Sequence, residues 1–380
     1  MESDSDTERP QSQDEKKVKS RRPPNNAFRQ QRLKAWQPIL TPRTVLPLFF
    51  SVAALFALFG GLLIWSSVIV QEIVIDYTEC AYKATSDFSD MKSSDILYHF
   101  KDNSSPRHAT QWKFVNGTDS NNEPVCTLRF DIPTEMGSPV YMFYRMTNFY
   151  QNHRRYVLSY NENQLEGKPE TNKTLKDKDD CKPLILAPDG RPYYPCGLIS
   201  NSLFNDTFAS PVNEENGTTY DMTTNGIAWP TDRNRFKKTQ YNNSQVVPPP
   251  NWAKMYPDGY TDENPIPDIS QWEEFQNWMR TAALPTFSKL ARRNDTTALQ
   301  PGTYTVDIVQ NFDTTLYRGK KMLVLSTRSA IGGRNNFLGI AYVVVAGLCA
   351  ALGIVFLIQH LVKPRRMGDH TYLSWNSERK

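Results

Sequence analysis

The chain has 380 residues, with 44 Lys or Arg against 40 Asp or Glu, so its formal net charge is only +4. Much of the basic charge lies near the ends: ten Lys or Arg precede residue 45. Because the net charge is small and the excess of basic residues lies near the ends of the chain, the composition does not indicate a nucleic-acid-binding surface.

Two uncharged apolar runs, residues 48–70 and 337–358, enclose most of the chain. With a rise of about 1.5 Å per residue, each helix would be roughly 33 to 35 Å long, enough to cross a hydrocarbon core of ~30 Å. Two crossings return the chain to its starting side, so one large domain is predicted between them. A cleaved signal peptide is a weaker alternative for the first run, which is long and begins far from the N-terminus.

Basic residues flank both predicted spans on their terminal sides, and Lys363, Arg365 and Arg366 directly follow the second span. The positive-inside rule therefore places both termini in the cytosol and the intervening domain outside it. We divide the chain into a disordered cytosolic tail (1–25), a juxtamembrane segment (26–44), a first membrane helix (45–71), an ectodomain (72–336), a second membrane helix (337–361) and a cytosolic tail (362–380).

Seven Asn-x-Ser/Thr sequons in the predicted ectodomain agree with a lumenal or extracellular position. Several would occur by chance in a domain so rich in Asn, Ser and Thr, so they support the orientation without establishing it. Pro106 follows the first sequon and makes it the weakest. The candidate glycosylation sites are Asn103, Asn116, Asn172, Asn205, Asn216, Asn242 and Asn294.

Four of the five cysteines, Cys80, Cys126, Cys181 and Cys196, also lie in the ectodomain, whereas Cys349 lies in the second span. An even set in an oxidising compartment indicates two disulfides. Of the three possible pairings we expect Cys80 with Cys126 and Cys181 with Cys196, since joining neighbours closes compact loops. A zinc site is the alternative, but no Cys-x-x-Cys pair is present.

The expected fold is a large β-rich, α+β ectodomain of antiparallel sheets, disulfide-bonded and glycosylated, between two transmembrane helices. Short runs rich in β-branched and aromatic residues predict strands at residues 124–132, 139–146, 304–309 and 321–326.

One ectodomain helix is also predicted, because Ser270 and Glu273 have the spacing of a capping box and apolar residues follow on one face. The proline-rich residues 246–267 should form a surface loop.

Catalytic and cofactor motifs are absent from the sequence. It has no Gly-x-Ser-x-Gly elbow, no phosphate-binding Walker loop and no His-Glu-x-x-His. We expect no cofactor, no metal and no catalytic residues. The apolar runs 48–70 and 337–358 contain no Asp, Glu, Lys, Arg or His, which argues against transport by this chain alone. A carboxylate pair of the glycosidase type would leave no sequence mark, so a membrane-tethered glycoside enzyme is a third hypothesis.

Two features point to a partner protein instead. Residues 26–38 place aromatic side chains among arginines just before the membrane, a pattern suited to anionic headgroups or to a cytosolic partner surface. Small residues at four-residue spacing in the first span allow another helix to approach closely. A solvated juxtamembrane stretch and the ordinary Gly and Ala content of membrane helices are the plain alternatives. The candidate partner-binding residues are Phe28, Arg29, Arg32, Trp36, Ala53, Ala57 and Gly61.

Several segments in this order are typical of one family. They are residues 26–38 (NAFRQQRLKAWQP), 144–156 (YRMTNFYQNHRRY), 195–208 (PCGLISNSLFNDTF), 226–230 (GIAWP), 280–287 (RTAALPTF), 323–327 (LVLST) and 332–342 (GGRNNFLGIAY). Over nearly its whole length after about residue 24, the chain resembles the Cdc-fifty/Lem family, and its four ectodomain cysteines match the pattern of fungal members. These proteins are β-subunits of type IV P-type ATPases that flip phospholipids.

The resemblance implies a non-catalytic accessory subunit that forms a heterodimer with the catalytic ATPase and contacts it on both sides of a membrane of phospholipids. It also implies that the ATPase needs this chain to leave the endoplasmic reticulum for the Golgi, endosomes or plasma membrane. A phosphorylatable Asp-Lys-Thr-Gly motif is absent, so ATP-driven work would come from the partner. The alternative from another class is a two-span cell-surface receptor or carbohydrate-binding glycoprotein.

Overall fold

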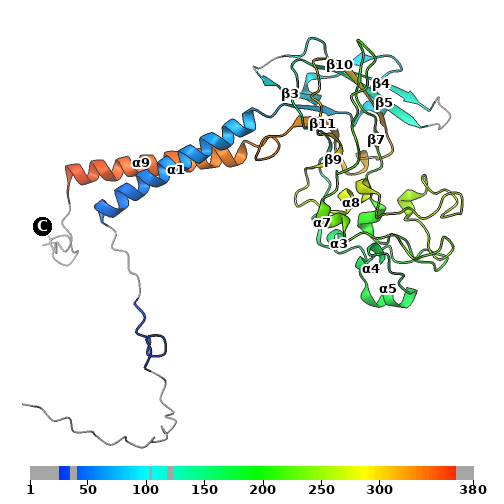
Figure 1. The fold of residues 1–380 in the computed structure, drawn as a ribbon, viewed down its shortest axis with the longest axis horizontal. Helices are drawn as coiled ribbons and strands as arrows, with labels where there is room; N and C mark the ends of the chain where they lie inside the picture. Colours follow the sequence, from blue (N-terminus) through cyan, green and yellow to red (C-terminus); the bar gives the residue numbers. More distant parts are fainter. Residues whose placement is uncertain (1–24, 35–40, 102–104, 118–122, 365–380) are drawn as a thin grey trace, which may run out of the picture. The chain divides into compact units, whose positions relative to one another are not determined.

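The computed structural model describes residues 25–34, 41–101, 105–117 and 123–364; the predicted sites Trp36 and Asn103 lie outside them, as does most of the tail predicted to be disordered. The chain divides into two compact units, residues 1–54 with 347–380 and residues 55–346, which we describe separately. Figure 1 follows the chain from helix α1 through the ectodomain to helix α9.

The two long apolar helices predicted from the sequence are α1 (Pro42–Val68) and α9 (Phe337–Val362). Both are long and apolar enough to cross a membrane. Helix α1 ends before the predicted run does, and Val70 is buried, 1% exposed. The chain leaves the helix there because the next residue is already bonded to the sheet: the Gln71 N–H donates to Thr327 Oγ1 at 2.9 Å.

The first ectodomain sheet has five antiparallel strands, and its central strand is β11, just before the second membrane helix. β11 pairs on one side with β1 and on the other with β6, whose outer neighbour is β9. In spatial order the strands are β3 (Ile96–His99), β1 (Glu72–Asp76), β11 (Lys321–Thr327), β6 (Val140–Met146) and β9 (Phe287–Asn294).

The second sheet is also antiparallel and is centred on β5 and β10. In β10, Tyr304, Val306 and Ile308 are buried, which agrees with the predicted two-residue period. The strands are β2 (Ser89–Asp90), β4 (Gln111–Asn116), β5 (Pro124–Ile132), β10 (Gly302–Val309) and β7 (Thr207–Phe208), with β8 (Val212–Asn213) also pairing with β10. All four predicted strands are therefore confirmed, to within two residues at each end.

One continuous hydrophobic core takes side chains from both sheets and from the segments inserted between β6 and β9. Figure 1 shows α3, α4, α5, α7 and α8 gathered together on one side of the strands. The short helices are α2 (Cys80–Lys83), η1 (Ser93–Asp95), α3 (Arg154–Val157), α4 (Glu162–Leu165), α5 (Asn172–Lys178), α6 (Leu198–Asn201), α7 (Pro230–Arg233), η3 (Pro250–Trp252), α8 (Glu273–Met279) and η4 (Thr315–Tyr317).

The proline-rich residues 246–267 are held to this core by aromatic side chains. The Trp252 indole N–H donates to the Ser200 carbonyl at 2.9 Å, and the Tyr260 hydroxyl donates to the Tyr194 carbonyl at 2.6 Å. Both rings are buried. A segment predicted as a surface loop therefore contributes to the core through its large aromatic residues.

The predicted capping box at the start of α8 is wrong. The helix begins at Glu273, and the Ser270 hydroxyl donates to Asp268 Oδ1 at 2.6 Å instead of capping the helix. Glu273 is buried, accepts the Ala228 N–H at 3.0 Å and pairs with Arg233 at 3.2 Å. Tertiary contacts took both side chains away from the local bonds that the spacing suggested.

Both disulfides have the predicted pairing. Cys80 of α2 joins Cys126 of β5 with a Cα–Cα distance of 6.2 Å, and Cys181 joins Cys196 at 5.6 Å. The first pair lies in the main core, whereas the second forms a small separate cluster with Leu175. Each disulfide therefore stabilises a different part of the ectodomain.

Candidate partner-binding site

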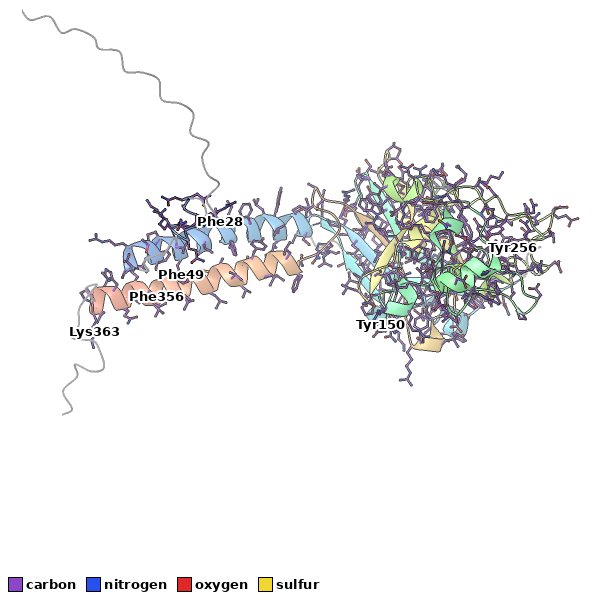
Figure 2. The ribbon with its side chains drawn as sticks, turned by 90° about the horizontal axis from the view of Figure 1, so that it is seen from below. Phe28, Phe49, Tyr150, Tyr256, Phe356 and Lys363 are labelled. Carbon is purple, nitrogen blue, oxygen red and sulfur yellow. A yellow bond between two sulfur atoms is a disulfide. The ribbon has the colours of Figure 1, made fainter. Side chains whose placement is uncertain are left out.

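The described part of the juxtamembrane segment, residues 25–34, contains one hydrogen-bonded turn. The Arg29 N–H donates to Asn26 Oδ1 at 2.7 Å, and the Arg32 N–H donates to the Ala27 carbonyl at 2.7 Å. The turn leaves Phe28, labelled in Figure 2, 76% exposed and Leu33 63% exposed. Exposed apolar side chains beside arginines form a surface suited to a membrane or a partner protein.

The small residues predicted to form one stripe on α1 do not share one surface. Ala53 is buried, but Ala57 and Gly61 are exposed, and a Cβ built on Gly61 would meet nothing within 4 Å. The glycine in close contact is its neighbour Gly60, where a Cβ would lie 2.8 Å from Val343 Cγ2 on α9. Gly339 is equally close to Ile64, so these two helical segments pack almost backbone to backbone.

The buried small residues recur at seven-residue spacing rather than at four. On α1 they are Ala53, Gly60 and Ser67, next to which Ser66 is also buried, and on α9 they are Gly339, Ala346 and Gly353. A seven-residue repeat keeps one face of a helix turned toward a packed neighbour. This repeat was the sequence signal for the contact, whereas the four-residue pattern mixed buried and exposed positions.

Aromatic rings make the contacts between α1 and α9 near the start of α1 and the end of α9. The ring centroids of Phe49 and Phe356, both labelled in Figure 2, are 5.7 Å apart, and Gly353 faces the ring of Phe50. Most large side chains of both helices remain exposed, among them Leu55, Leu58, Phe59, Leu62, Leu348, Leu352 and Val355. These faces are available to lipid or to helices of another chain.

In the ectodomain, the segments that carry the family resemblance meet one another. Tyr144 stacks on Phe204 with centroids 4.0 Å apart, and the Trp278 indole N–H donates to the Ile199 carbonyl at 2.9 Å. The Asn152 amide donates to the Ala283 carbonyl at 2.8 Å. Residues 144–156, 195–208 and 280–287 are thus mainly structural, because their contacts assemble the insertion between β6 and β9.

A buried ion pair joins residues 195–208 to the start of strand β11, and sequence reasoning did not find it. Lys321 Nζ lies 2.7 Å from Asp206 Oδ2, with the two side chains 4% and 0% exposed. Asp206 also accepts the N–H groups of Asn311 and Phe312 and the Tyr77 hydroxyl. Burial first, and the Asp206 charge next, raise the pKa of Tyr77 well above its usual value.

Lys289 of β9 is also buried, and no carboxylate of the described residues is bonded to it. Its Nζ donates to the carbonyls of Asn277, Trp278 and Arg280 at 2.6, 3.3 and 2.5 Å, at the C-terminal end of α8. Burial, together with the nearby Arg280 guanidinium, lowers the pKa of Lys289 to about 7. The Lys289 amine caps the C-terminal end of α8, because it donates hydrogen bonds to carbonyls that have no partner within the helix.

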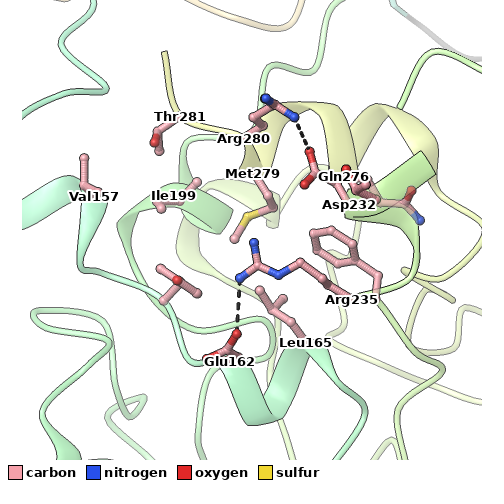
Figure 3. Close-up of a pocket in the computed structure, with 13 residues that line it drawn as sticks. Val157, Glu162, Leu165, Ile199, Asp232, Arg235, Gln276, Met279, Arg280 and Thr281 are labelled. Carbon is pink, nitrogen blue, oxygen red and sulfur yellow. Dashed lines mark hydrogen bonds and ion pairs between the residues drawn. The ribbon is translucent and has the colours of Figure 1, made fainter. Parts of the chain in front are cut away.

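A cavity of about 460 Å³ lies beside α8 and is drawn in Figure 3. The Arg235 guanidinium lies across it and pairs with Glu162 at 3.2 Å, and Arg280 pairs with Asp232 at 2.9 Å. Each carboxylate is therefore bound to an arginine, which does not suit a general acid. In the part of the chain that the structure describes, five carboxylates are buried, and each is likewise bonded to a different group: Glu72, Asp76, Asp131, Asp206 and Glu273.

Among the described residues, no group of three or more His, Cys, Asp or Glu side chains could hold a metal ion. The features that remain for a functional role are surfaces: the turn at Phe28, the exposed faces of the helices, and the ectodomain around its pockets.

Comparison with known proteins gives a consistent result. The chain is 46% identical over 361 residues to the phospholipid-transporting ATPase accessory subunit CRF1 of Saccharomyces cerevisiae, covering 94% of this chain and 90% of that protein. It is 43% identical to the accessory subunit CDC50 of Chaetomium thermophilum, covering 93% and 91%, and 38% identical to cell cycle control protein 50A of Bos taurus, covering 90% of each. Residues 63–366 match the LEM3 (ligand-effect modulator 3) family / CDC50 family, and the chain belongs to this family.

Proposed function

We propose that this chain is the non-catalytic accessory subunit of a phospholipid-transporting ATPase. It forms a heterodimer with the catalytic subunit, which depends on it for assembly, for exit from the endoplasmic reticulum and for moving phospholipid from the exoplasmic to the cytosolic leaflet. The observation that carries the proposal is the 46% identity to a relative named as such a subunit, over 94% of the chain. The similarity thus extends over the ectodomain and the membrane helices.

The proposed mechanism is stabilisation of the assembled ATPase by differential binding. On the membrane side, Ala57 and Gly61 are exposed on α1, so a helix of the catalytic subunit could approach there without meeting α9. On the cytosolic side, Phe28, Arg29 and Arg32 form the described part of the contact, with Trp36 beyond it. Exposed aromatic and arginine side chains are the types that most often contribute strongly to interfaces.

The experiment that tests the function is copurification in mild detergent with the catalytic subunit, followed by a lipid-flipping assay. We expect equal amounts of the two chains, and about tenfold less catalytic subunit with Phe28→Ala/Arg29→Ala, because an interface anchor contributes 1 to 2 kcal/mol or more. Phe28→Tyr/Arg29→Lys is the matched control and should retain the partner. Normal phospholipid uptake in cells lacking this chain and any related subunit would favour the receptor hypothesis.

We also propose that both termini are cytosolic and that the ectodomain is glycosylated. Asn216 is exposed and uses only its carboxamide oxygen in a local turn with Thr218. Asn294 instead uses its nitrogen, the atom that would carry the glycan, to donate to Asp221 and Thr297 at 2.7 Å each. The structure therefore favours Asn216 over Asn294 as an acceptor.

Endoglycosidase treatment of membranes should lower the mass of the wild-type chain. We expect Asn216→Gln to remove one glycan-sized step, whereas Asn294→Gln should leave the mass unchanged, because the bonds of Asn294 are incompatible with a glycan on the same nitrogen. No mass change on the wild type would argue against the orientation, and an equal step for both variants would argue against the assignment of sites.

A further inference from the structure

A second pocket, of about 440 Å³, lies along strands β6 and β9 of the first sheet. Its walls include the aromatic side chains of Tyr141, Phe143 and Trp229, and its edge includes Arg328 and the glycines 332 and 333. No Asp or Glu is among the residues that line it. The pocket thus combines apolar walls with positive charge.

Three cationic side chains are among the described residues that line the pocket, and one of them is available to a ligand. Lys289 donates to main-chain carbonyls, as described above. Arg293 donates to the Gly226 carbonyl at 2.7 Å and pairs with Asp295 at 2.7 Å. Arg328 is exposed, and within the described residues it has no hydrogen-bond or ion-pair partner.

The edge of the pocket is fixed to the end of a membrane helix. Residues 328–336 connect β11 directly to α9. Ser66 Oγ of α1 donates to Ser329 Oγ at 2.9 Å, and the Asn335 N–H donates to Ser67 Oγ at 2.9 Å. Trp65, one residue before this contact, is exposed, as expected for an aromatic side chain at the membrane interface. Arg328 and the glycine edge therefore lie at the level where helices leave the bilayer.

We propose that this pocket binds a phospholipid of the leaflet on the ectodomain side, with the Arg328 guanidinium on its phosphate and the aromatic walls against its glycerol and first methylenes. Arginine pairs with phosphate through two parallel N–H donors, and a site without carboxylates does not repel an anion. The apolar walls and the position at the end of the spans favour a membrane lipid over an acidic peptide. The proposal depends on the chain crossing a membrane and not on the proposed function.

The test is a binding titration of the full-length chain in maltoside detergent with dihexanoylphosphatidylcholine. Inorganic phosphate and dioctanoylglycerol are titrated in parallel, because they carry the phosphate and the acyl chains separately. We expect the phospholipid to bind and both fragments to bind at least tenfold more weakly. Arg328→Ala should raise the dissociation constant about tenfold, and Arg328→Lys should raise it less, since lysine keeps the charge without the paired donors.

Arg155→Ala is the matched control, because Arg155 is exposed on α3 and does not line the pocket. It should bind the phospholipid as the wild type does, and the melting temperatures of all variants should agree. Equal affinities of wild type and Arg328→Ala would overturn the proposal. If Arg328→Ala kept lipid affinity but lost copurification with the catalytic subunit, the pocket would instead bind an acidic segment of that protein. Wild-type affinity for inorganic phosphate equal to that for phospholipid would make it a free-phosphate site and overturn the lipid assignment.

Discussion

Replacing Asp206 with alanine should destabilise the ectodomain by about 3 to 5 kcal/mol, because it leaves the Lys321 ammonium buried without its partner. The same change removes the acceptor for the Asn311 and Phe312 N–H groups. A typical domain is stable by only ~5 to 15 kcal/mol, so the loss removes a substantial part of the stability and should increase retention in the endoplasmic reticulum. Thermal unfolding followed by tryptophan fluorescence, together with the fraction of protein leaving that compartment, measures the effect.

A matched control exists elsewhere in the same domain. Asp206 and Asp295 each occupy the middle position of a sequon and pair with a basic residue, but Asp295 is exposed. Asp295→Ala should cost less than about 1 kcal/mol, as for other exposed ion pairs. Asp206→Leu/Lys321→Met removes both buried charges and should recover the part of the loss that comes from the unpaired Lys321 ammonium, but not the part that comes from the Asn311 and Phe312 N–H groups. Equal losses for Asp206→Ala and Asp295→Ala would show that burial of the pair has no special effect.

The strands were predictable because their signal is local. β5 and β10 are read from β-branched residues and a two-residue period, and the cysteine pairing followed from sequence neighbours. The prediction of a capping box at Ser270 was wrong because it used only the spacing of neighbouring residues. The contacts that decide the position of Glu273 come from residues 228 and 233, far away in the sequence. Short helices of four to seven residues are set mainly by such tertiary contacts.

The candidate site was predicted only in part. The sequence identified the exposed aromatic and basic character of the turn at Phe28 and the chain's need for a partner. It missed the close contact at Gly60, because the prediction followed a four-residue pattern that leads to Ala57 and Gly61, and both of these residues are exposed. The pair of Asp206 and Lys321 joins residues 115 positions apart, and no pattern along one chain marks which charges will be buried together. The same holds for Arg328, whose proposed role depends on Tyr141 and Phe143 of β6 and on Trp229 before α7.

Removal of either disulfide should destabilise the ectodomain, but to a different extent and over a different region. In the chain-entropy model, removing the Cys80–Cys126 bond, with a separation of 46 residues, costs about 4 kcal/mol, and removing the Cys181–Cys196 bond, with a separation of 15, costs about 3 kcal/mol. The first bond lies in the main core between α2 and β5, whereas the second holds a separate cluster. Cys80→Ala/Cys126→Ala should therefore lower the unfolding temperature of the whole ectodomain.

Cys181→Ala/Cys196→Ala should act more locally, because both cysteines pack with Leu175 in a small cluster outside the main core, and a small cluster can open by itself. We expect faster proteolysis within residues 182–192, before Tyr194 of the main core, at a temperature where the rest of the ectodomain is intact. Cys349→Ala, which changes a free cysteine in α9, is the control and should change neither property. If both double variants unfolded in one transition at the same temperature, the two clusters would form a single cooperative unit, and the separation of their cores would have no consequence for stability.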